Sequence, residues 1–277
     1  MVISVSEAVR YTAAVLKPIS DEADREARLI VAHLSGCEPN RLIISSASID
    51  TEDIDPVVEK RRQGVPLQYI FGRWWFYNNE FLVGEGVLIP RQDTELLVET
   101  GLELIKDLKS PRVIDLCSGS GCIGISIACE RPDAEVVALE KYDAAFGYLK
   151  TNVEHIGAEN VKAVKADVLE KPFGEYDLIV CNPPYIPNGD KGELSPEVLN
   201  EPHTALFGGE DGLFFYREIT RLWKSALKKG GRLAFEVGIK EADLVARILE
   251  SEGFTQISFK TDLIGIQRVV FGTVNSL

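Results

Sequence analysis

The spacing of apolar residues changes about a quarter of the way along the chain. In the first part, apolar side chains recur three and four positions apart, as they do along one face of a helix. One such run covers 5–16 and stops before Pro18, and a second covers 27–34 and stops at Gly36. The pattern predicts two helices, each ended by a residue that does not continue a helix.

Two prolines mark further helix starts in the same region. Pro39 and Pro56 are expected to open short helices, because proline is favoured in the first turn, where its missing N–H is not needed. The second of these helices is expected to close at Gly64. Residues 1–72 are thus predicted to form a small helical domain. Because it holds no catalytic motif, we expect it to dock the substrate.

Aromatic and β-branched residues follow in two short runs. These runs, 73–77 and 80–83, have the composition of strands. Asn78 and Asn79 separate them, and asparagine tolerates the positive φ angles that tight turns need. We expect a β-hairpin here, within a linker that spans 73–92.

From residue 93 onward, helical and strand patterns alternate. The expected strands are 112–116, 135–140, 161–165, 177–181, 232–237, 255–259 and 267–272. The expected helices are 94–108, 122–130, 142–156, 213–228 and 240–252. Such alternation calls for an α/β fold with a mostly parallel sheet covered by helices on both faces. Ligands bind beyond the carboxyl ends of such strands, so the residues that follow each strand are the candidates for chemistry.

Composition and charge narrow the function classes. The chain has 277 residues, of which 45% are hydrophobic and 26% charged, as in an ordinary globular protein. Its 30 Lys and Arg residues against 43 Asp and Glu residues give a net charge of −13. That sign argues against a protein whose affinity comes from neutralising phosphates, so we expect no stable nucleic-acid binding.

The sequence predicts neither a metal site nor a membrane segment. Five cysteines without a Cys-x-x-Cys pair and only three histidines give no zinc pattern, and the cysteines are expected to be reduced core thiols. No window approaches the roughly 18 uncharged apolar residues that a spanning helix needs, and no signal peptide is visible. We therefore expect a soluble, cytoplasmic protein without a metal cofactor.

A glycine-rich loop follows the first strand of the alternating region. Gly119, Gly121 and Gly124 have the spacing G-x-G-x-x-G, and Glu140 ends the next strand 19 residues after Gly121. The glycines let the backbone approach a ligand, and the carboxylate can accept hydrogen bonds from two ribose hydroxyls. This predicts an adenosine-bearing cofactor, but the glycines do not decide which one.

Two acids shift the choice of cofactor away from a dinucleotide. Asp115 lies at the end of the strand before the loop, where an anion would repel a pyrophosphate but could hold the ammonium of an amino-acid tail. Asp167 follows the third strand, from where it could accept a hydrogen bond from an adenine amino group. A buried, hydrogen-bonded acid for Asp115 and a helix cap for Asp167 are the alternative interpretations.

The strongest local motif is Asn182-Pro183-Pro184-Tyr185, directly after an apolar strand. The prolines donate no backbone hydrogen bonds and stiffen the chain, so the turn presents two acceptors, the Asn182 side-chain oxygen and the Pro183 carbonyl. A planar group with two N–H donors fits such acceptors, and Tyr185 offers a surface on which the plane can stack. A rigid turn whose tyrosine packs inward is the alternative.

Together these features indicate methyl transfer from S-adenosylmethionine to a planar amino or amide nitrogen. Two fixed acceptors can orient an NH2 group so that its lone pair faces the sulfonium methyl. The same hydrogen bonds strengthen as the nitrogen gains positive charge, so they favour the transition state over the bound substrate. A neutral asparagine provides an acceptor without placing an anion in the pocket.

The chain resembles the HemK-type peptide chain release factor glutamine methyltransferases over nearly its full length. Besides the motifs above, that family is matched by the segments 68–72, 87–95, 201–206, 208–212 and 268–270. The resemblance implies a seven-stranded Rossmann-like S-adenosylmethionine-dependent methyltransferase domain over 93–277, with an antiparallel last strand, after a helical N-terminal domain. It also implies N5-methylation of the glutamine side chain in the Gly-Gly-Gln motif of release factors, which would be the protein partners.

The resemblance also assigns roles to residues. It implies that Asn182, Pro183 and Tyr185 form the catalytic set, with Pro184 completing the turn that binds the glutamine amide. The cofactor would be held by Asp115, Cys117, Ser118, Gly119, Ser120, Gly121, Glu140, Asp167, Val168 and Asn182.

Three positions depart from the pattern of such enzymes. Cys117 stands where many methyltransferases have glycine, and Glu140 replaces the commoner aspartate. Val168 leaves no aromatic ring directly after the third strand. An aromatic wall for adenine must therefore come from elsewhere.

Three alternative functions stay open at this point. An adenine N6 methyltransferase acting on nucleic acid would use the same Asn-Pro-Pro-Tyr logic, but residues 1–75 hold 11 acidic and 9 basic side chains and no basic footprint. A glutamine methyltransferase for a ribosomal protein would differ only in its N-terminal domain. A nicotinamide-binding Rossmann protein belongs to a different class.

Overall fold

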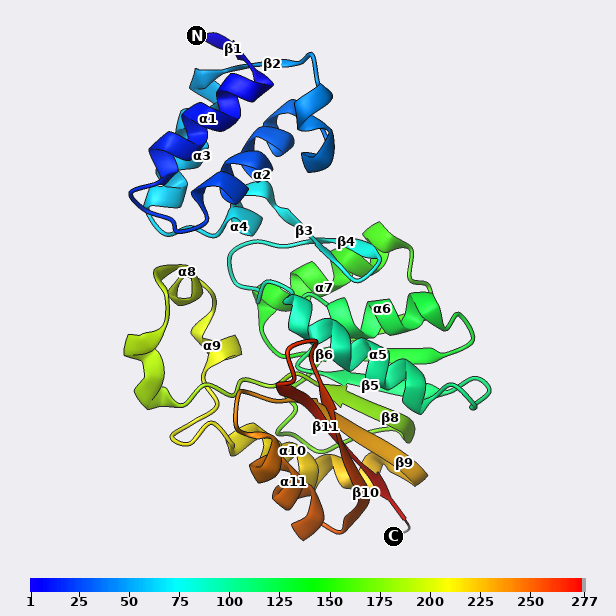
Figure 1. Cartoon of the computed structure of the whole chain (residues 1–277). Helices are drawn as coiled ribbons and strands as arrows, with labels where there is room; N and C mark the ends of the chain where they lie inside the picture. The colour runs from blue at the N-terminus through cyan, green and yellow to red at the C-terminus, as the bar shows by residue number, and fades with distance from the viewer. Residues whose placement is uncertain (276–277) are drawn as a thin grey trace. The chain divides into compact units, whose positions relative to one another are not determined.

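The computed structural model describes residues 1–275, except for the side chain of Ile43. The chain divides into two compact units (Figure 1). The first comprises Met1–Gly72 and Ser195–Asn200, and the second comprises Arg73–Leu194 and Glu201–Leu277. Over the described part of the chain, no helix has the length and apolar character that crossing a membrane requires.

The first unit is helical and encloses a core of aliphatic side chains. Its elements are β1 (Val2–Ser4), α1 (Val5–Leu16), α2 (Ala23–Ser35), the 3-10 helix Pro39–Ile44, β2 (Ser48–Asp50), α3 (Thr51–Arg62), α4 (Leu67–Phe71) and α8 (Pro196–Leu199). Leu16, Ile30 and Ile54 are fully buried between the helices. The helical spacing of apolar residues thus describes the faces that pack together.

Helix α3 begins five residues before the proline that was expected to open it, so that prediction was wrong. Asp50 caps the helix by accepting a hydrogen bond from the backbone N–H of Glu52. Pro56 lies inside the helix, between Ile54 and Val58, whose side chains are buried in the core. The free energy gained from the cap and from burying these two side chains exceeds the cost of the backbone hydrogen bond that a proline removes.

The second unit opens with the expected hairpin, although its turn lies one residue earlier than predicted. Strands β3 (Arg73–Phe76) and β4 (Asn79–Leu82) pair antiparallel, with Phe76 opposite Asn79. The turn is therefore Tyr77-Asn78, and Tyr77 adopts the positive φ of 55°. Its backbone N–H donates to Glu95, 2.8 Å away, which holds the tyrosine in that conformation.

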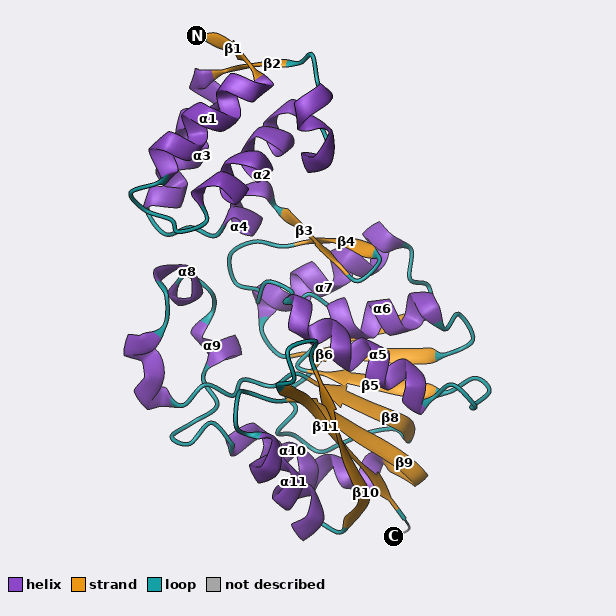
Figure 2. Cartoon of the chain, viewed as in Figure 1, coloured by secondary structure: helices purple, strands orange, loops and turns teal. Residues whose placement is uncertain are grey.

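The rest of the second unit is a seven-stranded sheet between two layers of helices (Figure 2). Its strands are β5 (Arg112–Leu116), β6 (Glu135–Glu140), β7 (Val161–Lys165), β8 (Tyr176–Cys181), β9 (Leu227–Glu236), β10 (Phe254–Thr261) and β11 (Gln267–Val274). Their order is β10-β11-β9-β8-β5-β6-β7, and β11 runs antiparallel to both neighbours. The predicted α/β fold, with a seven-stranded, mostly parallel sheet and an antiparallel last strand, is confirmed.

Helices cover both faces of this sheet (Figure 1). The helices of the unit are α5 (Glu95–Leu104), α6 (Cys122–Glu130), α7 (Asp143–Ile156), α9 (His203–Leu206), α10 (Phe214–Trp223) and α11 (Ala242–Ser251), with 3-10 turns at Gln92–Thr94, Asn188–Glu193 and Lys224–Ala226. Successive residues of β5 serve opposite layers: Val113 packs with α5, α6 and α7, whereas Ile114 packs with α10 and α11. This alternation explains why the strand is apolar on both faces.

The direction of winding reverses between β5 and β8, which lie side by side at the centre of the sheet. From β5 the chain continues outward to β6 and β7, and it then returns to β8 on the other side. Where the winding reverses in this way, the loops at the carboxyl ends separate and leave a crevice. The glycine loop follows β5, and the Asn-Pro-Pro-Tyr segment follows β8.

One buried side chain ties the hairpin to the glycine loop. Asn152 of α7, fully buried, accepts a hydrogen bond from the backbone N–H of Leu82 and donates to the carbonyls of Leu82 and Ser120, at 2.7, 3.1 and 2.9 Å. Removing a buried amide that binds three backbone groups is strongly destabilising, because each buried group left without a hydrogen-bond partner lowers the stability of the fold by about 1–3 kcal/mol.

We predict that Asn152→Ala lowers the free energy of unfolding of the second unit by about 2–4 kcal/mol. All three tryptophans lie in that unit, so tryptophan fluorescence during chemical unfolding measures it. Thr151→Ala, at the exposed neighbouring position, is the control and should change stability by less than about 0.5 kcal/mol. Equal unfolding midpoints for the two variants would contradict the role of Asn152.

Candidate functional site

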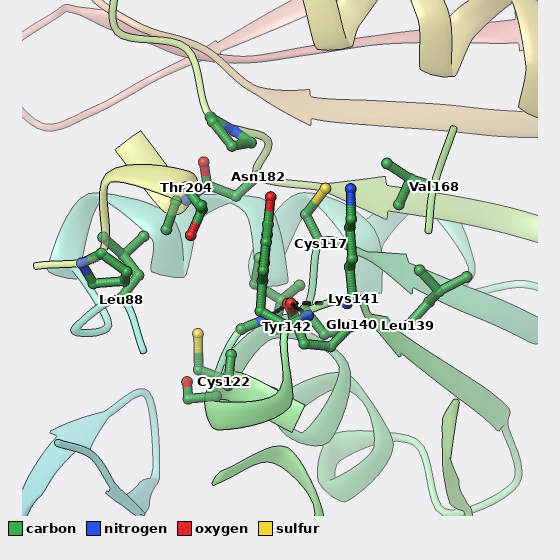
Figure 3. Close-up of a pocket in the computed structure, with 18 of the residues that line it drawn as sticks. Leu88, Cys117, Cys122, Leu139, Glu140, Lys141, Tyr142, Val168, Asn182 and Thr204 are labelled. Carbon is green, nitrogen blue, oxygen red and sulfur yellow. Dashed lines mark hydrogen bonds between the residues drawn. The ribbon is translucent and has the colours of Figure 1, made fainter. Parts of the chain in front are cut away.

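A pocket opens at the carboxyl ends of β5, β6 and β8 in the second unit (Figure 3). Its empty volume is about 940 Å³, counting the solvent at its mouth. Most of its wall is apolar, and few charged groups reach it. This is the usual character of a site for a small organic ligand.

The glycine loop forms the wall above β5. Gly121, with φ of 84°, precedes α6, and a Cβ atom there would lie 2.5 Å from the Leu149 side chain. Gly119 also has a positive φ, of 55°, and Cys117 adopts the same region at 57° although it carries a side chain. The loop therefore needs glycine at Gly121 for both backbone and space, and it stores strain at Cys117.

Glu140 fastens this loop to the end of β6. Its carboxylate accepts hydrogen bonds from the backbone N–H groups of Gly119, Lys141 and Tyr142, at 2.9, 2.8 and 2.8 Å. Burial raises the pKa of Glu140, although the three donors act to lower it. A carboxylate has about four acceptor positions, so about one is left for a ligand hydroxyl.

Asp115 lies beneath the loop, fully buried. Its Oδ2 accepts a hydrogen bond from the backbone N–H of Gly124 at 2.9 Å, and its Oδ1 has no hydrogen-bond partner within the described residues. Burial raises the pKa of Asp115 to about 7. Asp115 is not among the residues that line the pocket, so a ligand ammonium would reach it only across the loop or through water.

Asp167 lines the pocket beyond β7 and combines two roles. Its Oδ1 accepts from the backbone N–H of Leu169 at 2.9 Å, as a cap does, and its Oδ2 pairs with the Lys141 ammonium at 2.8 Å. Burial alone would raise the pKa of Asp167, but Lys141 and the Leu169 N–H lower it overall. The acid therefore stays ionised and can accept a further hydrogen bond.

Two aromatic rings line the pocket, and neither was predicted. Tyr142 follows β6, and Figure 3 shows its ring projecting into the pocket towards Asn182. Phe215 comes from α10. They supply the aromatic surface that Val168 cannot give.

Asn182 and Pro184 line the pocket, whereas Pro183 and Tyr185 are not among its lining residues. The Asn182 side chain donates from Nδ2 to the Thr94 hydroxyl at 3.4 Å. The Tyr185 ring packs against the core between the sheet and helices α10 and α11, and burial raises its pKa. In this structure the tyrosine therefore packs inward.

The segment 206–209 packs against the Asn-Pro-Pro-Tyr turn and is hydrogen-bonded to the residue that follows it. The backbone of Ile186 donates to Leu206 at 2.8 Å and accepts from Gly208 at 2.9 Å. A Cβ atom at Gly208 would lie 2.5 Å from the Pro184 carbonyl oxygen, so only glycine fits there. The run of glycines after the motif is thus a packing requirement.

The structure brings most of the sequence-predicted residues to one pocket. The lining includes 117–120, Glu140, 167–168, Asn182 and Pro184, but not Asp115, Gly121, Pro183 or Tyr185. Sequence reasoning missed the other lining residues, which are Gly86, 88–91, Thr94, 122–123, Leu139, 141–142, Ala145, Leu169, 202, 204–205 and Phe215. Of these, Lys141 and Tyr142 follow a parallel strand directly, and the rule that ligands bind at carboxyl ends could have found them.

Within the described residues, no group of three or more His, Cys, Asp or Glu side chains is placed to hold a metal ion.

Family comparisons agree with this architecture. Residues 92–212 match the methyltransferase small domain, and residues 7–72 match the PrmC N-terminal domain. A protein of Clostridium acetobutylicum named release factor glutamine methyltransferase is 38% identical, over 99% of both chains. One of the same name from Thermodesulfovibrio yellowstonii is 37% identical, over 89% of this chain and 91% of its own.

A solved structure is similar in fold. The Thermus thermophilus 16S rRNA N2 G1207 methyltransferase, in complex with AdoMet and guanosine, has a TM-score of 0.52 and 21% identity. The match covers 73% of this chain and 49% of that one. At this identity the likeness concerns the fold alone.

The shifted pKa of Asp115 predicts a pH dependence of stability. The ordinary pKa of an aspartate is 3.8, and that of Asp115 is about 7. Between these values the folded protein keeps a proton that the unfolded chain has lost, so this group makes the free energy of unfolding fall as pH rises. Above pH 7 both states are ionised, and the effect levels off.

Asp115→Asn removes this titration while keeping an acceptor for Gly124. Between pH 5 and pH 7, we expect the free energy of unfolding of the natural protein to fall by roughly 2–3 kcal/mol more than that of the variant. Chemical unfolding at each pH, without cofactor, measures the difference. Asp107→Asn at an exposed position should follow the natural protein; parallel pH curves for Asp115→Asn would refute the assignment.

Proposed function

The chain belongs to the release factor glutamine methyltransferase family, and we propose that it transfers the methyl group of S-adenosylmethionine to the side-chain N5 nitrogen of the glutamine in the Gly-Gly-Gln motif of a release factor. The observation that carries this proposal is the position of Asn182. It begins the loop after β8 and lines the same pocket as the glycine loop after the adjacent strand β5. An acceptor for an amide N–H thus lies beside a nucleoside-type site.

The pocket fits S-adenosylmethionine better than a dinucleotide. Its two lining cations are already paired, Lys141 with Asp167 and Arg91 with Glu201. A pyrophosphate would need free cations or donors, whereas an adenosine with an amino-acid tail needs acceptors and apolar walls. When bound, S-adenosylmethionine supplies an activated methyl group on a sulfonium.

The residues of the pocket divide this task. Glu140 offers its remaining acceptor to a ribose hydroxyl, and Asp167 offers one to the adenine amino group. Tyr142 gives the base an aromatic wall. These contacts hold the cofactor in one orientation, which fixes the direction in which a substrate nitrogen must approach.

Asn182 then selects and orients the substrate amide. Its side-chain oxygen accepts one N–H of the glutamine amide, and the Pro183 carbonyl accepts the other. An amide nitrogen is a weak nucleophile because its lone pair is delocalised, so the hydrogen bonds that favour the developing charge matter most. Transfer would break the bond between the methyl carbon and the sulfonium sulfur and leave S-adenosylhomocysteine. The nitrogen would then lose one proton to the solvent at the mouth of the pocket and become a neutral secondary amide.

The names of the relatives favour release factors over ribosomal proteins as substrate. Relatives at 37–41% identity are named release factor glutamine methyltransferase, and the N-terminal residues match the N-terminal domain of that family. We assign release factor docking to 1–72, the linker to 73–92 and catalysis to 93–277. Translation termination places the enzyme in the cytoplasm.

Asn182→Ala should lower kcat by about 100-fold or more, as the loss of an oriented hydrogen-bond partner does in other enzymes. Affinity for S-adenosylhomocysteine should stay within about threefold. The assay is transfer of labelled methyl to a purified release factor, with a factor whose Gly-Gly-Gln glutamine is alanine as the blank substrate. Asn188→Ala, exposed on the same loop, is the matched control.

Two results would overturn the proposal. One is turnover of Asn182→Ala within about twofold of the natural enzyme. The other is equal labelling of the release factor whose Gly-Gly-Gln glutamine has been replaced. Labelling of a ribosomal protein or of DNA, with none of the release factor, would assign the enzyme to another substrate.

Deleting 1–72 should abolish methylation of the release factor but keep both S-adenosylhomocysteine binding and slow methylation of a short Gly-Gly-Gln peptide. This follows because the pocket lies wholly in the second unit. The deletion also removes the partners of the segment 195–200, since Arg61 pairs with Glu197 and the Gly64 carbonyl accepts from Asn200.

A full-length variant distinguishes two explanations for the lost activity, namely loss of the docking domain and loss of the contacts that hold the segment 195–200. The double variant Glu197→Gln/Asn200→Ala breaks these contacts and keeps the domain. If it loses release factor methylation as fully as the deletion does, the position of the segment and not docking explains the loss. Full activity of the deletion towards the release factor would also contradict the assignment.

A further inference from the structure

A buried acid, Glu236, lies next to Asn182 but outside the wall of the pocket. Glu236 ends β9, which pairs in parallel with β8, and the last register pair is Cys181 with Phe235. The residues that come next are Asn182, directly after β8, and Glu236, the last residue of β9, so the register brings them side by side. Glu236 is only 4% exposed, and it is not among the pocket-lining residues. It therefore does not touch a ligand there.

Glu236 belongs to a small polar cluster with Thr94 and Asn182. Hydrogen bonding by the Thr94 and Asn182 side chains acts to lower the pKa of its carboxyl group, and Thr94 also accepts from Asn182 Nδ2 at 3.4 Å. Thr94 is 2% exposed and Glu236 is 4% exposed, so water hardly reaches these two side chains. Of the Glu236 oxygens, Oε2 is buried and has no hydrogen-bond partner within the described residues.

Few charges surround this cluster. Asp93 raises and Arg268 lowers the pKa of Glu236, and burial, the largest influence, brings it to about 7. Arg268 is already paired with Asp93 and Asp262, at 2.8 and 3.2 Å. The other titratable groups that Glu236 influences have pKa values raised by burial and are neutral, namely Cys122, Cys181, Tyr185 and Tyr216.

The cluster decides which end of the Asn182 amide faces the pocket. The two ends of an amide have nearly the same shape, so hydrogen-bond partners set its orientation. An ionised carboxylate only accepts, and it therefore attracts the NH2 end. The Thr94 hydroxyl accepts from that same end and can donate its own hydrogen to the acid. Inverting the amide would place Asn182 Oδ1 against a carboxylate, acceptor against acceptor.

We propose that Glu236 is a positioning residue that fixes the Asn182 amide with its oxygen towards the substrate. This inference rests on the proposed function and adds a basis for substrate choice. A pocket that presents only acceptors at this point selects a side chain with N–H donors, a carboxamide, and disfavours a glutamate carboxylate of the same shape.

The nature of the side chain supports a role beyond packing. Burying a carboxylic acid with an unpartnered oxygen costs stability, and an apolar side chain of similar size would not carry that cost. A group that is both buried and shifted in pKa beside a binding pocket is typical of functional sites. The ionised form is what discriminates the NH2 end from the oxygen end of Asn182.

Glu236→Gln should lower kcat by at least about 10-fold, because glutamine accepts either orientation of the neighbouring amide. The KM for the release factor and the Kd for S-adenosylhomocysteine should stay within about threefold. In the natural enzyme kcat should rise with pH through about 7, as Glu236 ionises, and the variant should lack this rise. A protein that is merely destabilised would not lose one limb of its pH profile.

Glu241→Gln is the matched control. Glu241 also has a pKa that burial raises to about 7, but its partners are the Gly238 N–H and the Tyr216 hydroxyl. We expect it to keep kcat within about twofold and to keep the rise with pH. Equal losses in both variants would overturn the inference.

Thr94→Val tests the cluster independently and decides the case if Glu236→Gln does not fold. It removes the shared hydroxyl and keeps the side-chain shape, so kcat should fall with little change in KM. The inference is overturned if Asn182→Ala loses turnover while Glu236→Gln and Thr94→Val stay within about twofold of the natural enzyme. If Asn182→Ala itself is active, the proposed function fails first, so the two failures are distinguishable.

Discussion

The pairing of β5 with β8 is the constraint on which the rest of the site depends. In this ladder Leu116 pairs with Cys181, so the glycine loop and Asn182 begin at the same level of the sheet. Both strands are buried on both faces, and a slip of one residue would exchange the side chains that serve the two helix layers. The register is therefore fixed by packing, and the position of Asn182, the proposed substrate acceptor, relative to the glycine loop follows from it.

Much of this arrangement follows from local sequence. Three of the sheet's strands, β5, β6 and β7, begin and end where the pattern places them, because apolar residues and turn residues agree there. Pro56 shows the opposite case: the proline signal is overridden by a cap five positions earlier and by core contacts from distant helices. Tyr77 takes the turn conformation because Glu95, distant in sequence, binds its backbone. Such effects are tertiary, and no local window contains them.

The residues of the pocket likewise fall into two groups, those that the sequence could predict and those that only the fold reveals. Residues that follow a strand directly, such as Glu140 and Asn182, could be predicted because parallel strands share one functional edge. Phe215 belongs to a helix and the segment 88–91 to a loop before the sheet, and only the fold brings them to the pocket. Glu236 carries no motif, although it too ends a parallel strand. The edge rule, applied to every strand, would have singled it out.

The carboxyl edge of the sheet explains why position 182 must be neutral. Asp115 is the last but one residue of β5 and Glu236 is the last residue of β9, the two neighbours of β8, and burial raises the pKa of each acid to about 7. An acid at position 182 would lie beside Glu236, and two neighbouring acids disfavour each other's ionisation. If protonated, it would present a donor where the substrate nitrogen needs an acceptor. An amide is the side chain that accepts without a charge, and the adjacent acid that would disfavour an aspartate is the group that we propose orients this amide.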